Sequence, residues 1–156
     1  MNSRELAVKT LLRVNREGAY SNLETKKVLA RKDYKEEDKG LYLNMVYGVL
    51  QNKLYLDYLL SKYVKKPLDE LDPKVLEILR TAVYQVYFLD KIPEYAVVNE
   101  AVTMTGKLQP RAKGFVNGVL RNVLRNKEKD RVFNPEDFDN EKDALSVRYS
   151  IPLWIV

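Results

Sequence analysis

The sequence contains no cysteine and no histidine. Their absence excludes a disulfide framework, a zinc or iron–sulfur site built on these residues, a cysteine nucleophile and a histidine general base. Glycine and proline are scarce, at 6 residues each in a chain of 156, which is untypical of low-complexity sequences. Most familiar enzyme chemistries lack a required group here. We therefore expect no catalytic residue, no cofactor site and no metal site in this chain.

Long hydrophobic runs are missing as well. The longest stretch without a charged residue runs from Gly40 to Asn52 and has 13 residues, whereas a membrane-spanning helix needs about 20 apolar residues. The N-terminal segment MNSRELAVKT lacks the apolar region of a secretory signal peptide. We therefore expect no membrane association and a cytoplasmic location.

The residues that are present favour one helical domain. Hydrophobic residues make up 46% and charged residues 31% of the chain, as in ordinary globular proteins. Apolar residues recur at helical spacing almost throughout, and no strand-length alternation occurs. The pattern predicts an all-α fold, a single antiparallel bundle of about seven helices joined by short loops. The predicted helices cover residues 3–17, 21–31, 33–51, 54–63, 73–89, 95–107 and 111–126.

Helix-start residues support these boundaries. Ser, Asp and Asn side chains can accept hydrogen bonds from the free N–H groups of a first helical turn, and a Glu three residues later completes a capping box. Gly18 is a typical helix end. The candidate caps are Ser3, Ser21 with Glu24, Asp33 with Glu36, and Asp72 before Pro73.

Positive charge is concentrated in two blocks. Residues 1–32 hold eight Lys/Arg and three Asp/Glu, which gives +5, and residues 106–131 hold eight and two, which gives +6. Residues 33–105 and 132–156 are each at −3, so the chain totals +5. The blocks favour a phosphate-binding surface where they meet in the fold. The alternative is two solvated helix faces that never meet.

The predicted helix 111–126 is strongly amphipathic. At about 100° per residue, we expect an inward face of Phe115, Val116, Val119, Leu120 and Val123. The opposite stripe has residues four apart, namely Lys113, Asn117, Arg121 and Arg125. Gly114 and Gly118 would let a phosphate approach the backbone closely. Alternatively, they permit tight packing against another helix, and the Lys/Arg stripe is then only solvated.

Three motifs give the chain a family resemblance. Arg80–Gln85 (RTAVYQ), Ile92–Val102 (IPEYAVVNEAV) and Gly114–Arg121 (GFVNGVLR) follow one another in the order and spacing of the NusB family. The resemblance covers residues 3 to 127. It implies the all-α, RNA-binding fold of a bacterial transcription antitermination factor.

Further motifs narrow the resemblance. Tyr47–Leu50, Leu56–Leu60, Lys66–Leu68 and Arg148–Val156 are similar to the NusB-like domain of the RsmB (Sun) family, and Arg121 stands where the stand-alone factor usually has Asp. That family comprises S-adenosylmethionine-dependent enzymes that make 5-methylcytosine in small-subunit rRNA. The resemblance implies a NusB-like RNA-binding domain over residues 1–127 and a tail, 128–156, that leads into a catalytic domain outside this chain.

The implied chemistry needs parts that this chain lacks. Attack on cytosine C6 in that family requires a cysteine thiolate, and no Gly-rich cofactor loop occurs here. The apolar ending Leu153–Val156 also indicates the N-terminal part of a longer enzyme. S-adenosylmethionine is therefore expected in the following domain. The expected partners are small-subunit rRNA and the protein's own C-terminal methyltransferase domain.

Two readings compete with this one: a stand-alone antitermination factor that binds RNA with a ribosomal protein, and a protein-interaction module that docks the catalytic domain. Arg80, amid apolar residues, is expected to hold the fold together by pairing with Glu77 or Glu100. Asn99 and Glu100 are likewise expected in a polar network of the bundle. The candidate RNA contacts are Arg4, Lys9, Arg13, Lys113, Asn117, Arg121 and Arg125.

Overall fold

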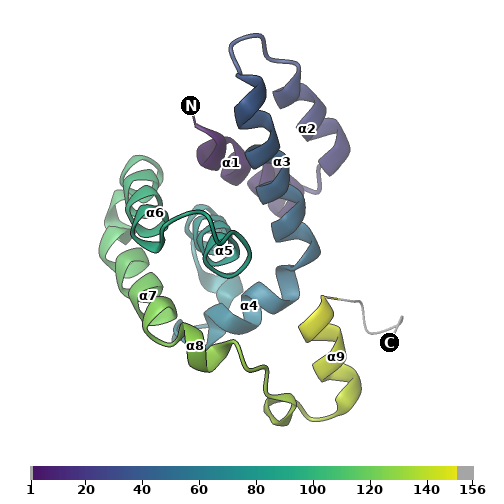
Figure 1. The fold of residues 1–156 in the computed structure, drawn as a ribbon, viewed down its shortest axis with the longest axis vertical. Coiled ribbons are helices and arrows are strands. Elements are labelled where there is room, and N and C mark those ends of the chain that lie inside the picture. Colours follow the sequence, from purple (N-terminus) through teal and green to yellow (C-terminus); the bar gives the residue numbers. More distant parts are fainter. Residues whose placement is uncertain (1, 151–156) are drawn as a thin grey trace.

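The computed structural model describes residues 2–150, which form an all-α fold without strands (Figure 1). The predicted fold class is therefore confirmed. Residue 1 and residues 151–156 lie outside the described part, as do the apolar ending and most of the last RsmB-like motif. The helices are α1 Ser3–Glu17, α2 Ser21–Leu29, α3 Glu36–Gln51, α4 Lys53–Ser61, α5 Pro73–Phe88, α6 Glu94–Leu108, α7 Lys113–Arg125, α8 Lys127–Asp130 and α9 Glu141–Tyr149.

The first seven helices match the seven predicted ones. Two further helices, α8 and α9, lie in the tail. The predicted seventh helix starts two residues too early, because Pro110–Ala112 forms a separate 3₁₀ turn before α7. Other boundaries shift by one to three residues, which is usual for helix ends.

Some of the predicted caps are wrong. The Asn2 side chain, not that of Ser3, accepts from the Glu5 N–H at 2.8 Å. The Ser3 hydroxyl is instead buried, and its Oγ bonds to the Tyr34 hydroxyl at 2.7 Å. The Ser3 side chain, predicted to cap the helix, thus makes a long-range contact instead.

Neither predicted capping box forms. Helix α2 follows Tyr20 and α3 follows Lys35, and neither start has a side-chain cap. Asp33 pairs with Arg31 at 3.1 Å instead. The Asp72 cap is confirmed: its carboxylate accepts from the Lys74 N–H at 2.8 Å, with Pro73 in the first turn. The predicted stop at Gly18 is also confirmed, with a left-handed φ of 75°.

Helix α5 is the centre of the bundle. Twelve of its sixteen residues are buried, and it contacts α1, α3, α4, α6 and α7. Figure 1 shows these helices arranged around it. One contact requires a glycine: a Cβ at Gly48 on α3 would overlap the Tyr84 ring of α5. Close packing of this kind fixes the positions of the outer helices.

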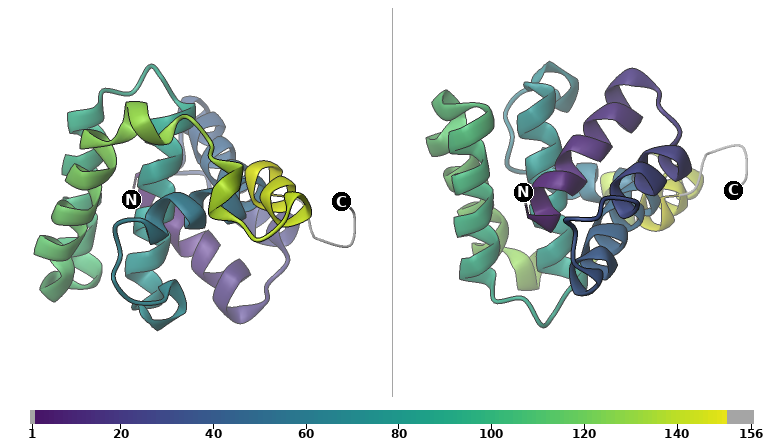
Figure 2. Two further views of the ribbon diagram at one scale, coloured as in Figure 1. Left: turned by 90° about the horizontal axis from the view of Figure 1, so that it is seen from below. Right: turned by 90° about the horizontal axis from the view of Figure 1, so that it is seen from above.

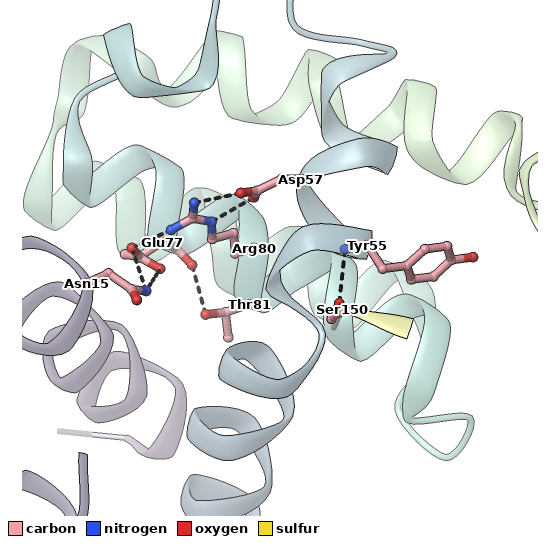
Figure 3. A network of polar contacts seen from close by, with 7 residues as sticks. All are labelled: Asn15, Tyr55, Asp57, Glu77, Arg80, Thr81 and Ser150. Carbon is pink, nitrogen blue, oxygen red and sulfur yellow. Dashed lines mark hydrogen bonds and ion pairs between the residues drawn. The ribbon is translucent and has the colours of Figure 1, made fainter. Parts of the chain in front are cut away.

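A polar network ties three helices together inside the bundle (Figure 3). Arg80 on α5 donates from Nε and NH2 to Asp57 on α4, both at 2.8 Å, and from NH1 to Glu77 at 2.9 Å. Asn15 on α1 also donates to Glu77. Burial raises the pKa of Glu77, although the Arg80 charge opposes the shift.

The predicted structural role of Arg80 is confirmed. Its partner is Glu77 rather than Glu100. The second partner, Asp57, was not predicted from the sequence. The side chains of Asn99 and Glu100 make no hydrogen bond or ion pair within residues 2–150, so their assignment to a polar network is wrong. The three charged side chains hold α4 and α5 in register.

The tail packs on α4. Asp130 is buried and contacts Lys62 Nζ at 3.3 Å and the Tyr63 hydroxyl. Helix α9 lies along α4, and the Tyr55 N–H donates to Ser150 Oγ at 3.2 Å (Figure 3). Figure 1 shows α9 and α2 at opposite ends of the molecule, so the tail leaves α1 and α2 uncovered.

No helix among residues 2–150 is both long enough and apolar enough to cross a membrane.

Candidate nucleic-acid interface

Helix α7 presents a basic outer face. Its buried residues are Val116, Val119, Leu120 and Val123, as predicted. Lys113, Arg121 and Arg125 are exposed and Asn117 is half-buried. Phe115 was expected inside, but it is 38% exposed and lies on the flank of the helix. The stripe predicted from the spacing therefore faces solvent, with an aromatic ring beside it.

The cations of this face are not neutralised. Arg121 Nε donates to Asn117 Oδ1 at 3.1 Å, and Arg125 NH1 donates to Asn122 Oδ1 at 2.9 Å. Within residues 2–150, neither arginine nor Lys113 forms an ion pair. Amide partners orient the guanidinium groups and leave their charge available to an anion.

Gly114 and Gly118 face open space. A Cβ built at either position meets no atom within 4 Å among the residues described, so the alternative of tight helix packing is wrong. Each glycine costs about 1 kcal/mol of helix propensity relative to alanine, and no contact within the fold requires it. Bare backbone between arginines suits the close approach of a large ligand.

A hollow of about 380 Å³ opens next to Phe115. Leu71 and Val75 are buried beneath it. The exposed Lys66 and Arg111 line it as well. An apolar floor, an aromatic wall and two cations together suit a flat ring that carries a phosphate.

A polar contact stabilises the rim of this hollow. Gln109 Nε2 donates to Asp72 Oδ2 at 2.8 Å. Although burial favours the protonated acid, the hydrogen bonds from Gln109 and the Lys74 N–H hold the pKa of Asp72 below its ordinary value. This hydrogen bond therefore links the cap of α5 to the end of α6.

The two basic blocks approach each other at the end of α6. The Lys113 side chain passes over Gly106 at the end of α6, where its Cδ would lie 3.4 Å from a Cβ. The next residue, Lys107, places Nζ 3.8 Å from Glu5 Oε2 on α1. Helix α1 begins beside α6 and runs away from it toward α2 (Figure 2). One lysine of the second block therefore reaches the start of α1.

The three basic candidates on α1 do not share one face. Arg4 is half-buried, and its Nε donates to Gln85 Oε1 of α5 at 2.8 Å. Lys9 and Arg13 lie on the side of α2, where Arg13 NH1 contacts Glu24 Oε2 at 3.0 Å. At 100° per residue, Arg4 and Arg13 point in opposite directions.

Comparison with known proteins identifies the fold and the family. A family model described as the NusB family matches residues 1–125, which include the bundle and the whole of α7. The chain belongs to the NusB family. A solved structure of the antitermination factors NusB and NusE in complex with dsRNA superposes with a TM-score of 0.72 at 23% identity, covering 79% of this chain and 93% of that one. This likeness supports the NusB fold.

Two curated relatives of this NusB-family chain differ in how much of their own length it matches. A probable ribosomal RNA small subunit methyltransferase B from Bacillus subtilis is 36% identical over 98% of the chain, but only 33% of the relative is covered. A transcription antitermination protein NusB from Bacillus licheniformis is 31% identical over 78% of the chain and 92% of the relative. The chain thus spans about a third of the methyltransferase relative and most of the antitermination relative.

The NusB fold explains which contributors sequence analysis missed. Lys66 and Lys107 come from elements other than the amphipathic stripe, and only the fold places them near α7. The exposure of Phe115 was not predicted, because helical periodicity places a phenylalanine at the border of an apolar face among the buried residues. One available signal was the absence of acidic residues between Glu100 and Glu128, which covers the whole α6–α7 turn.

Proposed function

We propose that this NusB-family domain binds small-subunit rRNA and positions it for a cytosine-C5 methyltransferase domain that follows it in a longer protein. One observation carries the proposal: the exposed cations of α7 form no ion pair within residues 2–150, and Lys107 at the end of α6 extends this basic face toward α1. Phosphate groups are the natural ligand of such a face. The relative named ribosomal RNA small subunit methyltransferase B, which matches 98% of the chain, supports rRNA as the target.

The proposed contacts divide into two kinds. Lysine and arginine contacts to phosphate provide affinity and orientation but carry no sequence information. Phe115, beside the hollow, is suited to stack on an unpaired base. Arg4 is left out of the proposed set because Gln85 and the α5 surface hold its side chain. The phosphate contacts that remain are Lys9, Arg13, Lys113, Arg121 and Arg125, with Asn117 as the group that orients Arg121.

Methyl transfer itself does not fit this chain. Residues 2–150 contain no strand, and the sequence has no cysteine, so neither a strand–loop–helix cofactor site nor a thiolate nucleophile is available. S-adenosylmethionine, the methyl donor, would be held by the following domain. The contribution of this domain is to bind and orient RNA in the cytoplasm.

Tethering of this domain to a catalytic domain would raise the local concentration of bound RNA. Two linked modules reach effective concentrations on the order of mM. RNA held on α7 would therefore be presented to an attached catalytic domain at far above its free concentration. Even a micromolar affinity of this domain for RNA would then increase the fraction of time that RNA spends at the catalytic domain.

A stand-alone antitermination factor is the second candidate. It is favoured by the Bacillus licheniformis NusB protein, 92% of which this chain matches. It predicts binding to RNA in company with a partner protein, as in the solved NusB–NusE complex with dsRNA. The third reading, a protein-interaction module, predicts no RNA affinity at physiological salt and tight binding to the separate catalytic domain.

Fluorescence anisotropy tests the RNA target and distinguishes RNA binding from the protein-interaction reading. Labelled fragments that tile small-subunit rRNA would be titrated with the chain at several salt concentrations, against an unrelated RNA of equal length. The proposal predicts binding that weakens with salt and a preferred fragment. Equal affinity for every RNA would contradict an rRNA target, and no binding at low salt would support the interaction module.

A further inference from the structure

A second basic groove lies between α1 and α2, on the side of α1 away from Arg4. It has a volume of about 260 Å³. Leu6 is buried at its α1 side, and Val28 lies opposite on α2. Its charged lining residues are Lys9, Arg13, Glu24, Lys27 and Arg31.

One carboxylate holds two of these cations in place. Arg13 NH1 and Lys27 Nζ lie 3.0 and 3.5 Å from the Glu24 carboxylate, which is only 12% exposed. The Arg13 hydrogen bond, together with the Lys27 charge, keeps the pKa of Glu24 below its ordinary value. Glu24 therefore stays ionised at neutral pH and attracts both cations to the groove.

The groove retains an excess of positive charge. Arg31 pairs with Asp33 at 3.1 Å, whereas Lys9 has no ion-pair partner within residues 2–150. Four cations thus face two carboxylates, which leaves +2. Thr25 is the one buried residue of α2. The charges of this helix are therefore displayed at the surface and contribute little to the core.

The groove continues the basic face of α7. Lys9 lies one helical turn after Glu5, the residue that Lys107 of α6 approaches. Lys113 passes over Gly106, the neighbour of Lys107. Basic side chains therefore follow one another from α7 across the middle of α1 into the groove.

We propose that the α1–α2 groove is a second phosphate-binding site, which takes the backbone of the same RNA strand that α7 binds. The inference rests on the proposed function and extends it, because it adds Lys27 and Arg31 of α2 to the contacts. An RNA long enough to reach both sites gains the groove contacts, and a short RNA held at α7 does not.

RNA length and a double substitution test this proposal. The chain with K27A and R31A would be titrated with RNAs of about six and about sixteen nucleotides, within the usual range of single-strand site sizes. The salt slope is the fall in the logarithm of the binding constant with the logarithm of the salt concentration. Each lost phosphate contact lowers it by about 0.7, so two lost contacts weaken binding by about 25-fold at 0.1 M salt. The matched control, K142A with R148A, removes the same charges from exposed positions on α9.

The proposal predicts about 25-fold weaker binding of the longer RNA to K27A/R31A, a salt slope smaller by about 1.4 and unchanged binding of the short RNA. The control should bind both RNAs as the unsubstituted chain does. Equal binding of the longer RNA to K27A/R31A and the unsubstituted chain would overturn the second site and leave the proposed function standing. An equal loss for both RNAs would also overturn it, and failure of the unsubstituted chain to bind either RNA would overturn the proposed function itself.

Discussion

Replacing Arg121 and Arg125 by alanine isolates the basic face of α7. Both side chains are exposed, and each donates one hydrogen bond to an asparagine of the same helix. Neither forms an ion pair within the described part of the chain. Exposed substitutions of this kind change stability by about 0.5 kcal/mol or less. The double substitution should therefore leave the fold intact.

The effect on RNA binding should be large by comparison. Two lost phosphate contacts lower the salt slope by about 1.4 and the affinity at 0.1 M salt by about 25-fold, which is about 1.9 kcal/mol. Anisotropy titrations at several salt concentrations measure both quantities, and a thermal melt should show a shift of no more than about 4 °C for a domain of this size. An unchanged slope with an unchanged affinity would refute the assignment of this face.

Three other substitutions test the packing and the polar contacts. G118A should raise the free energy of unfolding by about 0.5–1 kcal/mol, because alanine favours a helix more than glycine does. It should also weaken RNA binding, because the added methyl group blocks the approach to the backbone. A lower melting temperature would contradict the open surface. R80A should cost about 3 kcal/mol in urea unfolding, because it leaves two carboxylates without their cation; a loss below about 1 kcal/mol would contradict the network. G48A should cost about 1–3 kcal/mol by forcing the Tyr84 ring aside, and an unchanged thermal melt would disprove the contact.

The sequence was sufficient for the features that depend on local periodicity. The central helix α5, its Asp72 cap and the amphipathic pattern of α7 all follow from spacing and residue type. In each case the local preference and the tertiary contacts agree. Where they disagree, prediction failed: the Ser3 hydroxyl bonds to Tyr34, 31 residues away.

The candidate site was predictable in part. The stripe on α7 could be read from four-residue spacing, and the two basic blocks from charge counts. The exposure of Gly114 and Gly118 could not, because glycine suits both a packed and an open helix face. The route by which the blocks join depends on Lys107 approaching Glu5, and only the packing of α1 beside α6 brings these residues together.

Cross-linking of a bound rRNA fragment, followed by mass spectrometry of the peptides, tests the central claim most directly. The basic face predicts cross-links to the segment 106–125 and to α1, and Phe115 is the expected aromatic site. Helix α9 packs against α4, outside this face, and should stay free of RNA. Cross-links confined to α4 and α9 would contradict the account.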